Sequence, residues 1–112
     1  MVTDTAYSIK NKWMTLITKA QMIKLLKGGS KNMVPVIKMF MLNITWYVTG
    51  IEDGILYGYG DLGQGIVEFG SLTTVDELPK IRHRFGYMER DRYFKPNKKL
   101  KGEDYLAMES LS

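Results

Sequence analysis

The stretch from residue 44 to residue 60 constrains the fold most, because it contains two strand patterns and the turn that joins them. In "ITWYVT" (44–49), β-branched and aromatic residues predominate, and alternate residues, Trp46 among them, fall on one face. Asp53-Gly54 is a strong signal for a two-residue hairpin turn, and "ILYGYG" supplies the second strand. We therefore expect an antiparallel hairpin, with Trp46 largely buried against a helix from the N-terminal part of the chain.

Further strand patterns flank this hairpin on both sides. "VPVIKMFML" (34–42) precedes it, and "IVEFG" (66–70) follows the glycine-rich turn "DLGQG". A last strand is expected near residues 88–94, after a loop through Gly86, and it should end at Pro96. Successive antiparallel strands joined by short loops form a meander. The pattern thus predicts an antiparallel sheet of about four or five strands.

A helix is predicted ahead of the sheet, and both of its ends are marked in the sequence. Thr18 and Gln21 have the spacing of a capping box, in which each side chain bonds the backbone N–H of the other residue. Gly28-Gly29 is a stop signal, since glycine readily adopts the left-handed conformation that ends helices. The apolar contacts of this helix are expected from four residues at near-helical spacing: Ile17, Met22, Leu25 and Leu26.

A second, short helix is predicted between the meander and the last strand. Thr74 and Glu77 repeat the capping-box spacing, and Pro79 should stop or distort the helix that follows. The fold class is therefore α+β. The expected organisation is a flexible N-terminal extension (1–13), a single α+β domain (14–96) and a polar C-terminal tail (97–112).

Composition narrows the class of protein further. A chain of 112 residues is expected to form one domain with its own core. The absence of cysteine excludes disulfides and thiolate metal sites. No apolar run approaches the roughly 18 residues that would span a bilayer, and residues 1–13 lack the apolar segment of a signal peptide. We therefore expect a cytoplasmic protein with no membrane association.

Charge is arranged in blocks along the chain. Residues 1–38 hold seven bases and one acid, residues 39–79 hold six acids and no base, and residues 80–101 hold nine bases and two acids. The last segment, 102–112, holds three acids. Such blocks can produce a dipolar surface that steers partners. The alternative is that the acidic middle and the basic ends pair within the fold.

The basic block 80–101 is the candidate partner-binding segment. Its bases alternate with aromatic residues, which is the composition of many nucleic-acid surfaces. No recognised nucleic-acid-binding module is visible, and a protein partner with an acidic surface would fit the same charges. A purely solvated surface is the third interpretation. The residues we select as partner-binding candidates are Arg82, Arg84, Arg92, Lys95, Lys98 and Lys99.

No catalytic constellation is visible in the sequence. His83 is the only histidine, lies between two arginines, and has no carboxylates at ligand spacing that would complete a metal site. "GYGDLGQG" superficially resembles a phosphate-binding loop, but a strand pattern follows it and no base lies between Lys38 and Lys80. We therefore expect no enzymatic activity, no metal and no cofactor.

Several of these segments also carry a family resemblance. Four segments occur in order over roughly residues 14–96: "LITKAQ", "ITWYVT", "YGDLGQGIVEFGSL" and "MERDRYFKP". In these segments the chain resembles a bacterial family known as domain of unknown function 2958. That family is carried largely on plasmids, conjugative elements and phages. The resemblance implies an α+β domain and supplies no activity. The motif residues singled out are Trp46, Asp61, Gly63, Gly65, Gly70, Glu89, Arg90 and Asp91.

The "ERD" triplet (89–91) is interpreted as structural. On a strand, Glu89 and Asp91 would share one face while Arg90 points to the other. We expect Arg90 to reach into the fold and bond a carboxylate bidentately; contact with a ligand is the alternative.

Three functional hypotheses follow. The first is a non-enzymatic binding protein of a mobile genetic element, with inhibition of a host defence complex as one concrete form suggested by the resemblance. The second is a sequence-tolerant nucleic-acid-binding protein that uses residues 80–101. A small enzyme is the third.

Overall fold

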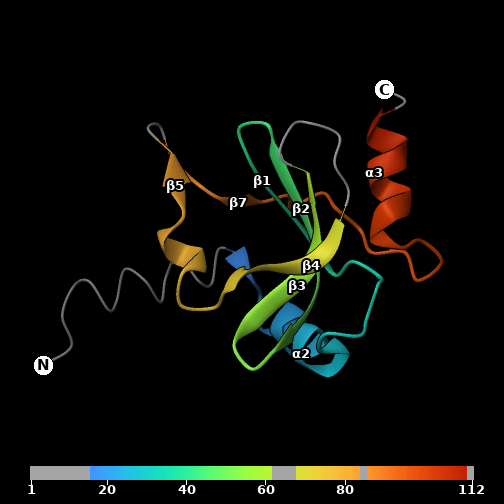
Figure 1. Cartoon of the computed structure of the whole chain (residues 1–112), viewed down its shortest axis with the longest axis horizontal. Helices are drawn as coiled ribbons and strands as arrows, with labels where there is room; N and C mark the ends of the chain where they lie inside the picture. The colour runs from blue at the N-terminus through green and yellow to red at the C-terminus, as the bar shows by residue number, and fades with distance from the viewer. Residues whose placement is uncertain (1–15, 62–67, 84–85, 111–112) are drawn as a thin grey trace, which may run out of the picture.

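The computed structural model describes residues 16–61, 68–83 and 86–110, and its centre is one five-stranded antiparallel sheet with the strand order β4-β3-β2-β1-β7 (Figure 1). A two-stranded hairpin and two helices complete the α+β fold, which confirms the fold class expected from the sequence. The strands are β1 (Ile37–Met41), β2 (Ile44–Glu52), β3 (Ile55–Asp61), β4 (Glu68–Thr74), β5 (Arg82–His83), β6 (Gly86–Tyr87) and β7 (Glu89–Arg90).

The predicted meander is confirmed from β1 to β4. Asp53 and Gly54 both have positive φ angles, 52° and 74°, as the expected two-residue turn between β2 and β3 requires. The pairing of β2 with β3 shifts register between Val48 and Gly50. This bulge matters for packing, because it brings Gly50 against the end of the N-terminal helix.

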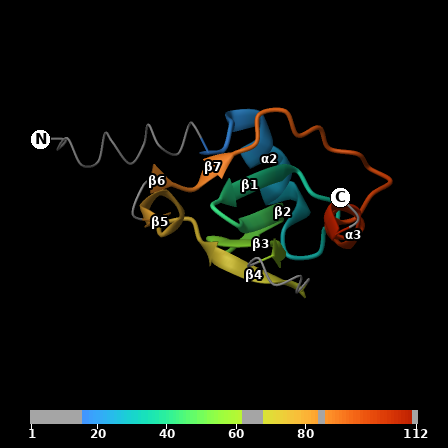
Figure 2. The ribbon, with the colours of Figure 1, turned by 90° about the horizontal axis from the view of Figure 1, so that it is seen from above.

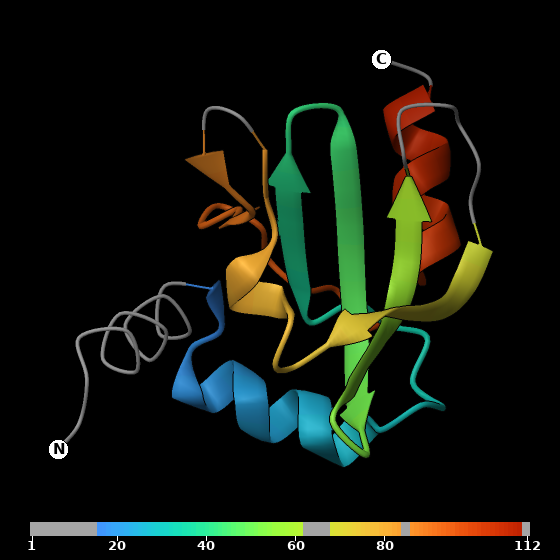
Figure 3. The same ribbon diagram turned by 60° about the vertical axis from the view of Figure 1, so that its left-hand side comes forward.

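The helix α2 (Lys19–Gly28) lies across one end of the sheet (Figure 3). Its capping box forms as predicted: the Thr18 hydroxyl accepts from the Gln21 backbone N–H at 3.1 Å, and Gln21 Oε1 accepts from the Thr18 N–H at 2.9 Å. Leu25 is fully buried, whereas Leu26 is 57% exposed, so the expected core role of Leu26 is wrong. Successive residues of a helix are about 100° apart, so Leu25 faces the core, with Met22 partly buried against it, while Leu26 faces away.

The predicted second helix is present as a single 3₁₀ turn, η1 (Leu78–Lys80). The Thr74 hydroxyl accepts from the Glu77 N–H at 3.2 Å, so the capping-box spacing forms a turn here and the helix starts only afterwards. Pro79 lies inside η1 and is buried. A proline is tolerated at the start of a helix because the first N–H groups have no intrahelical acceptor.

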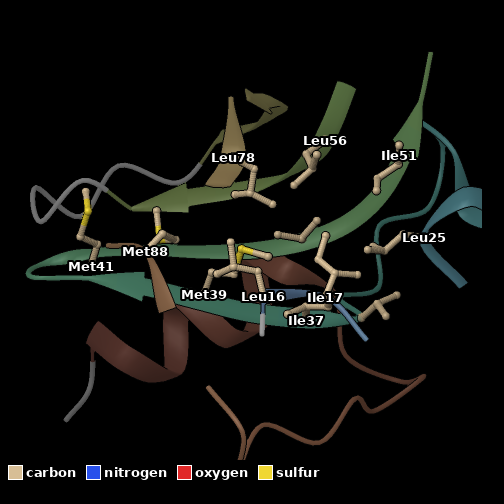
Figure 4. Packing of buried hydrophobic residues seen from close by; sticks show 12 residues of the cluster. Leu16, Ile17, Leu25, Ile37, Met39, Met41, Ile51, Leu56, Leu78 and Met88 are labelled. Atoms are coloured by element: carbon tan, nitrogen blue, oxygen red, sulfur yellow. The ribbon is translucent and has the colours of Figure 1, made fainter. Parts of the chain in front are cut away.

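The main core covers one face of the sheet (Figure 4). Residues from the segment before α2, from η1 and from Met88 close over the central strands, and burying this apolar area is the main favourable term in folding. The buried cluster consists of Leu16, Ile17, Leu25, Val36, Ile37, Met39, Met41, Val48, Ile51, Leu56, Leu78 and Met88.

The opposite face of the sheet is covered by a second helix, α3 (Gly102–Ser110), which Figure 2 shows on the other side from η1 and β5. The sequence leads us to expect a polar tail over residues 97–112, and the structure differs there. Tyr47 and Tyr59 of the sheet are buried under α3 and form an aromatic cluster with partly buried Phe69, Phe94 and Tyr105. The amphipathic pattern of α3 is weak, so its sequence gives little indication that it packs.

The two aromatic residues in the middle of β2 are buried to different extents. Tyr47 is 2% exposed, stacks on Tyr105 at a ring-centroid distance of 5.1 Å, and meets Phe94 edge-on at 5.9 Å. Trp46 is only partly buried, on the core face, and its ring lies beside Gly60. Trp46 is therefore less buried than expected, and the deeply buried aromatic residue of β2 is its neighbour Tyr47.

Candidate binding surface

The charge blocks of the sequence are only partly separated in the fold. Acidic residues occupy the β3–β4 side, where Asp61 ends β3 and Glu68 begins β4, and exposed Asp76 and Glu77 follow β4. The ribbon of residues 91–101 runs along the β1–β7 side (Figure 2), and the bases of this segment and of α2 are exposed. Acidic Glu52 accepts from the Ser30 N–H just after α2 at 3.3 Å, so opposite charges also meet at the end of this helix.

Hydrogen bonds fix the residues that flank the segment 91–101, one to α2 and one to the segment that follows α2. At the start, Arg90 Nη1 donates to Gln21 Oε1 in the first turn of α2 at 3.3 Å. At the end, the Gly102 N–H donates to the carbonyl oxygen of Met33, in the segment that follows α2, at 3.1 Å. We call the exposed bases of these two segments the basic surface: Lys19, Lys24, Lys27, Arg92, Lys95, Lys98, Lys99 and Lys101.

The structure divides the six predicted partner-binding residues. Arg92, Lys95, Lys98 and Lys99 are all exposed on the basic surface. Arg82 is exposed on β5, and the β5–β6 hairpin lies at the other end of the domain from the turn before α3 (Figures 1 and 2). Arg84 lies outside the described residues. The block 80–101 is therefore two separate surfaces, because β7 joins the main sheet between them.

The lysines of α2 are the part of this surface that sequence reasoning missed. The pattern was nevertheless present, since Lys19, Ile23 and Lys27 recur every four residues and share one helix face. The structure leaves Ile23 57% exposed on that face. The helix therefore presents apolar area between its charges.

Two residues of the "ERD" triplet bond to other parts of the fold. The Arg90 side chain donates to the neutral amide oxygen of Gln21, whereas a carboxylate was the expected acceptor. Asp91 fixes the next turn: its N–H donates to the Lys38 carbonyl at 2.8 Å, and its carboxylate lies 3.9 Å from Lys38 Nζ. Glu89 is exposed. The triplet thus joins β1, β7 and α2.

Among the glycine-rich motif residues, Gly70 lies in β4 with open space around it, and Asp61 is partly buried at the end of β3. Gly63 and Gly65 lie outside the described residues. An open hollow of about 290 Å³ lies beside Gly70, and the described residues that line it are Trp46, Gly60, Glu68, Phe69, Gly70, Ser71 and Leu72. Among the described residues of this lining, Glu68 is the ionisable one, and its side chain is exposed.

Tyr59 of β3 has a raised pKa. Burial raises the pKa of its phenol above the ordinary value of 10.0, and nearby Glu103 and Asp104 raise it further. The neutral phenol donates to Met33 Sδ at 3.3 Å. Since the unfolded chain ionises first as pH rises, this contribution to stability is present below about pH 10 and is lost above it.

We therefore expect the free energy of unfolding to fall between about pH 9 and about pH 11 by less in Tyr59→Phe than in the wild type. Denaturant titrations of both proteins at the two pH values measure this difference. An equal fall in both would show that Tyr59 is not responsible.

Among residues 16–61, 68–83 and 86–110, no group of three or more histidine, aspartate or glutamate side chains is placed to hold a metal ion. His83 lies in β5, and its side chain is outside the described part. Within the same residues, no helix is both long and apolar enough to cross a membrane.

A family model described as "Protein of unknown function (DUF2958)" matches residues 9–109. The chain belongs to this family. The match confirms the resemblance given by the four sequence segments, and it reaches beyond residue 96 to include α3. A search of curated proteins and a search of solved structures give no significant match.

Proposed function

We propose that this protein is a non-enzymatic binding protein that docks its basic surface on an acidic surface of a protein partner. The observation that supports the proposal is the exposure of every base of α2 and of residues 91–101, two segments linked by the hydrogen bond from Arg90 to Gln21. Complementary charges of this kind guide encounter and suppress wrong partners. The exposed apolar Ile23 within the surface adds area that a protein partner can bury.

The resemblance to proteins of plasmids, conjugative elements and phages leads us to propose a narrower partner class as well. A protein of a mobile element that binds without catalysis can act by occupying a component of its host, and a host defence complex is the component we propose. This narrower form is supported by the resemblance alone.

The basic surface can be tested with two matched double variants. Lys98→Glu/Lys99→Glu changes the basic surface, and Lys80→Glu/Arg82→Glu makes the same change in net charge at the other end of the domain. We expect the first variant to bind the partner at least about tenfold more weakly and the second to bind like the wild type. Affinity capture from host lysate, followed by titration of the captured and purified protein, measures both.

Equal loss in the two variants would show that only net charge matters, and no loss in either would contradict the proposal. Thermal unfolding of both variants serves as the control, since all four side chains are exposed and the fold should be kept.

Nucleic acid is the alternative partner, favoured by the exposed Tyr93 within the basic segment. The salt dependence of the binding affinity distinguishes the two proposals. Binding through phosphates loses affinity with a log–log slope of about −0.9 per neutralised phosphate. A protein interface should respond less steeply, because salt screens mainly the charges at its rim. Titration of random duplex and single strands at about 50 mM salt, with no binding found, would remove the alternative.

A further inference from the structure

We infer that Tyr93, with Arg92 beside it, is the anchoring residue of the basic surface and inserts into a pocket with an acidic rim on the partner protein. This inference rests on the proposed function and adds to it the residue that carries most of the binding energy. It starts from one observation. Tyr93 is 93% exposed, more than any other large hydrophobic side chain that the described part of the chain exposes.

The backbone around Tyr93 is fixed on its N-terminal side. The Tyr93 N–H donates to Asp91 Oδ1 at 2.9 Å, and the Phe94 N–H donates to the Asp91 carbonyl oxygen at 3.3 Å, which closes a tight turn. Asp91 is itself bonded to β1 through the Lys38 carbonyl at 2.8 Å. The turn is therefore a direct continuation of the main sheet.

The C-terminal side of the turn is anchored by an aromatic side chain. The Phe94 ring lies 5.9 Å from the Tyr47 ring and 5.2 Å from the Tyr105 ring, in the cluster between the sheet and α3. Consecutive residues thus have opposite environments, with Phe94 packed inward and Tyr93 held in solvent. Nothing in the main core or the aromatic cluster requires the Tyr93 ring.

A tyrosine held in this way is well suited to anchor an interface. It offers a large amphipathic surface with only two side-chain torsions to order, and its backbone is already in place, so binding costs little conformational entropy. Tyrosine and arginine are enriched among residues that dominate binding energy. Arg92 is exposed next to Tyr93 and can bond a carboxylate at the pocket rim with two N–H groups.

The local chemistry favours a protein over a single-stranded nucleic acid. Stacking platforms place successive bases on several aromatic side chains, whereas here Phe94 is turned inward and Tyr93 stands alone in its turn. A protein pocket can enclose the single Tyr93 ring and place a carboxylate of its rim against Arg92.

The contact is tested first by photo-crosslinking. A photoreactive phenylalanine analogue replaces Tyr93 in the full chain, and a matched protein carries it at Leu42, which is 70% exposed in the turn between β1 and β2. In host lysate we expect position 93 to crosslink to one protein through a peptide rich in aspartate and glutamate, and excess wild-type protein to abolish the adduct. Crosslinks removed by nuclease, or equal crosslinks from position 42, would overturn the inference.

The contribution of Tyr93 to the binding energy is measured with the partner protein identified by crosslinking. This partner is purified and titrated with the wild type and with three variants. Tyr93→Ala should weaken binding by about 30-fold or more, Tyr93→Phe by much less, and Leu42→Ala by less than about twofold. Thermal unfolding should be unchanged in Tyr93→Ala, since its side chain is exposed.

The titration also separates this inference from the proposed function. If Lys98→Glu/Lys99→Glu loses binding while Tyr93→Ala binds within about threefold of the wild type, the basic surface stands and the anchor is wrong. If neither variant loses binding, both are wrong.

Discussion

Gly50→Ala is expected to destabilise the domain by at least about 3 kcal/mol, or to prevent its folding. A Cβ at this position would overlap the carbonyl oxygen of Gly29, the residue that ends α2 with a φ of 58°. The obstacle is backbone on both sides, and neither a rotamer change nor a small shift of a side chain can relieve it. The α2 C-terminus would have to leave β2, and buried Leu25 would move with it.

Gly70→Ala is the matched control for this prediction. Gly70 also lies in a strand of the main sheet, but no atom lies within 4 Å of the place its Cβ would take. We expect its free energy of unfolding to change by no more than about 0.5 kcal/mol. Chemical denaturation of both variants measures the difference. A Gly50→Ala protein within about 1 kcal/mol of the wild type would show that the close approach of α2 and β2 is not required.

Tyr47→Ala should destabilise the domain by about 3–5 kcal/mol, more than Trp46→Ala in spite of the larger indole ring. Tyr47 is 2% exposed and contacts both Phe94 and Tyr105, so its removal leaves a cavity between the sheet and α3. Trp46 is partly exposed beside the open hollow, and water can enter the space that it leaves.

Two measurements check this comparison. Denaturant titrations give the order of the two free energies, and hydrogen exchange of residues 102–110 reports whether α3 loosens. We expect faster exchange in α3 for Tyr47→Ala alone, because Trp46 lies on the face away from α3. A larger loss in Trp46→Ala, with α3 unaffected in both, would contradict the proposed order.

The sequence predicts which residues of the basic surface are exposed, but it does not predict which of them lie together. The exposure of Arg92, Lys95, Lys98 and Lys99 follows from their charge, because an unpaired charge is rarely buried. Their separation from Arg82 does not follow from it. That separation depends on β7 pairing with β1, which places the two halves of one basic block at different ends of the domain.

Local chemistry in the sequence was sufficient for the meander, the Asp53-Gly54 turn and the capped α2, because each depends on residues adjacent in the chain or on a period of two or four. The role of α3 depended on tertiary structure. Its weak amphipathic pattern acquires a partner only when the sheet presents Tyr47 and Tyr59, and when Gly102, lacking a side chain, lets the backbone lie on the Tyr59 ring. The partial exposure of Trp46 and the joining of Arg90 to Gln21 were decided in the same way, since they bring together residues far apart in sequence whose contact no local period encodes.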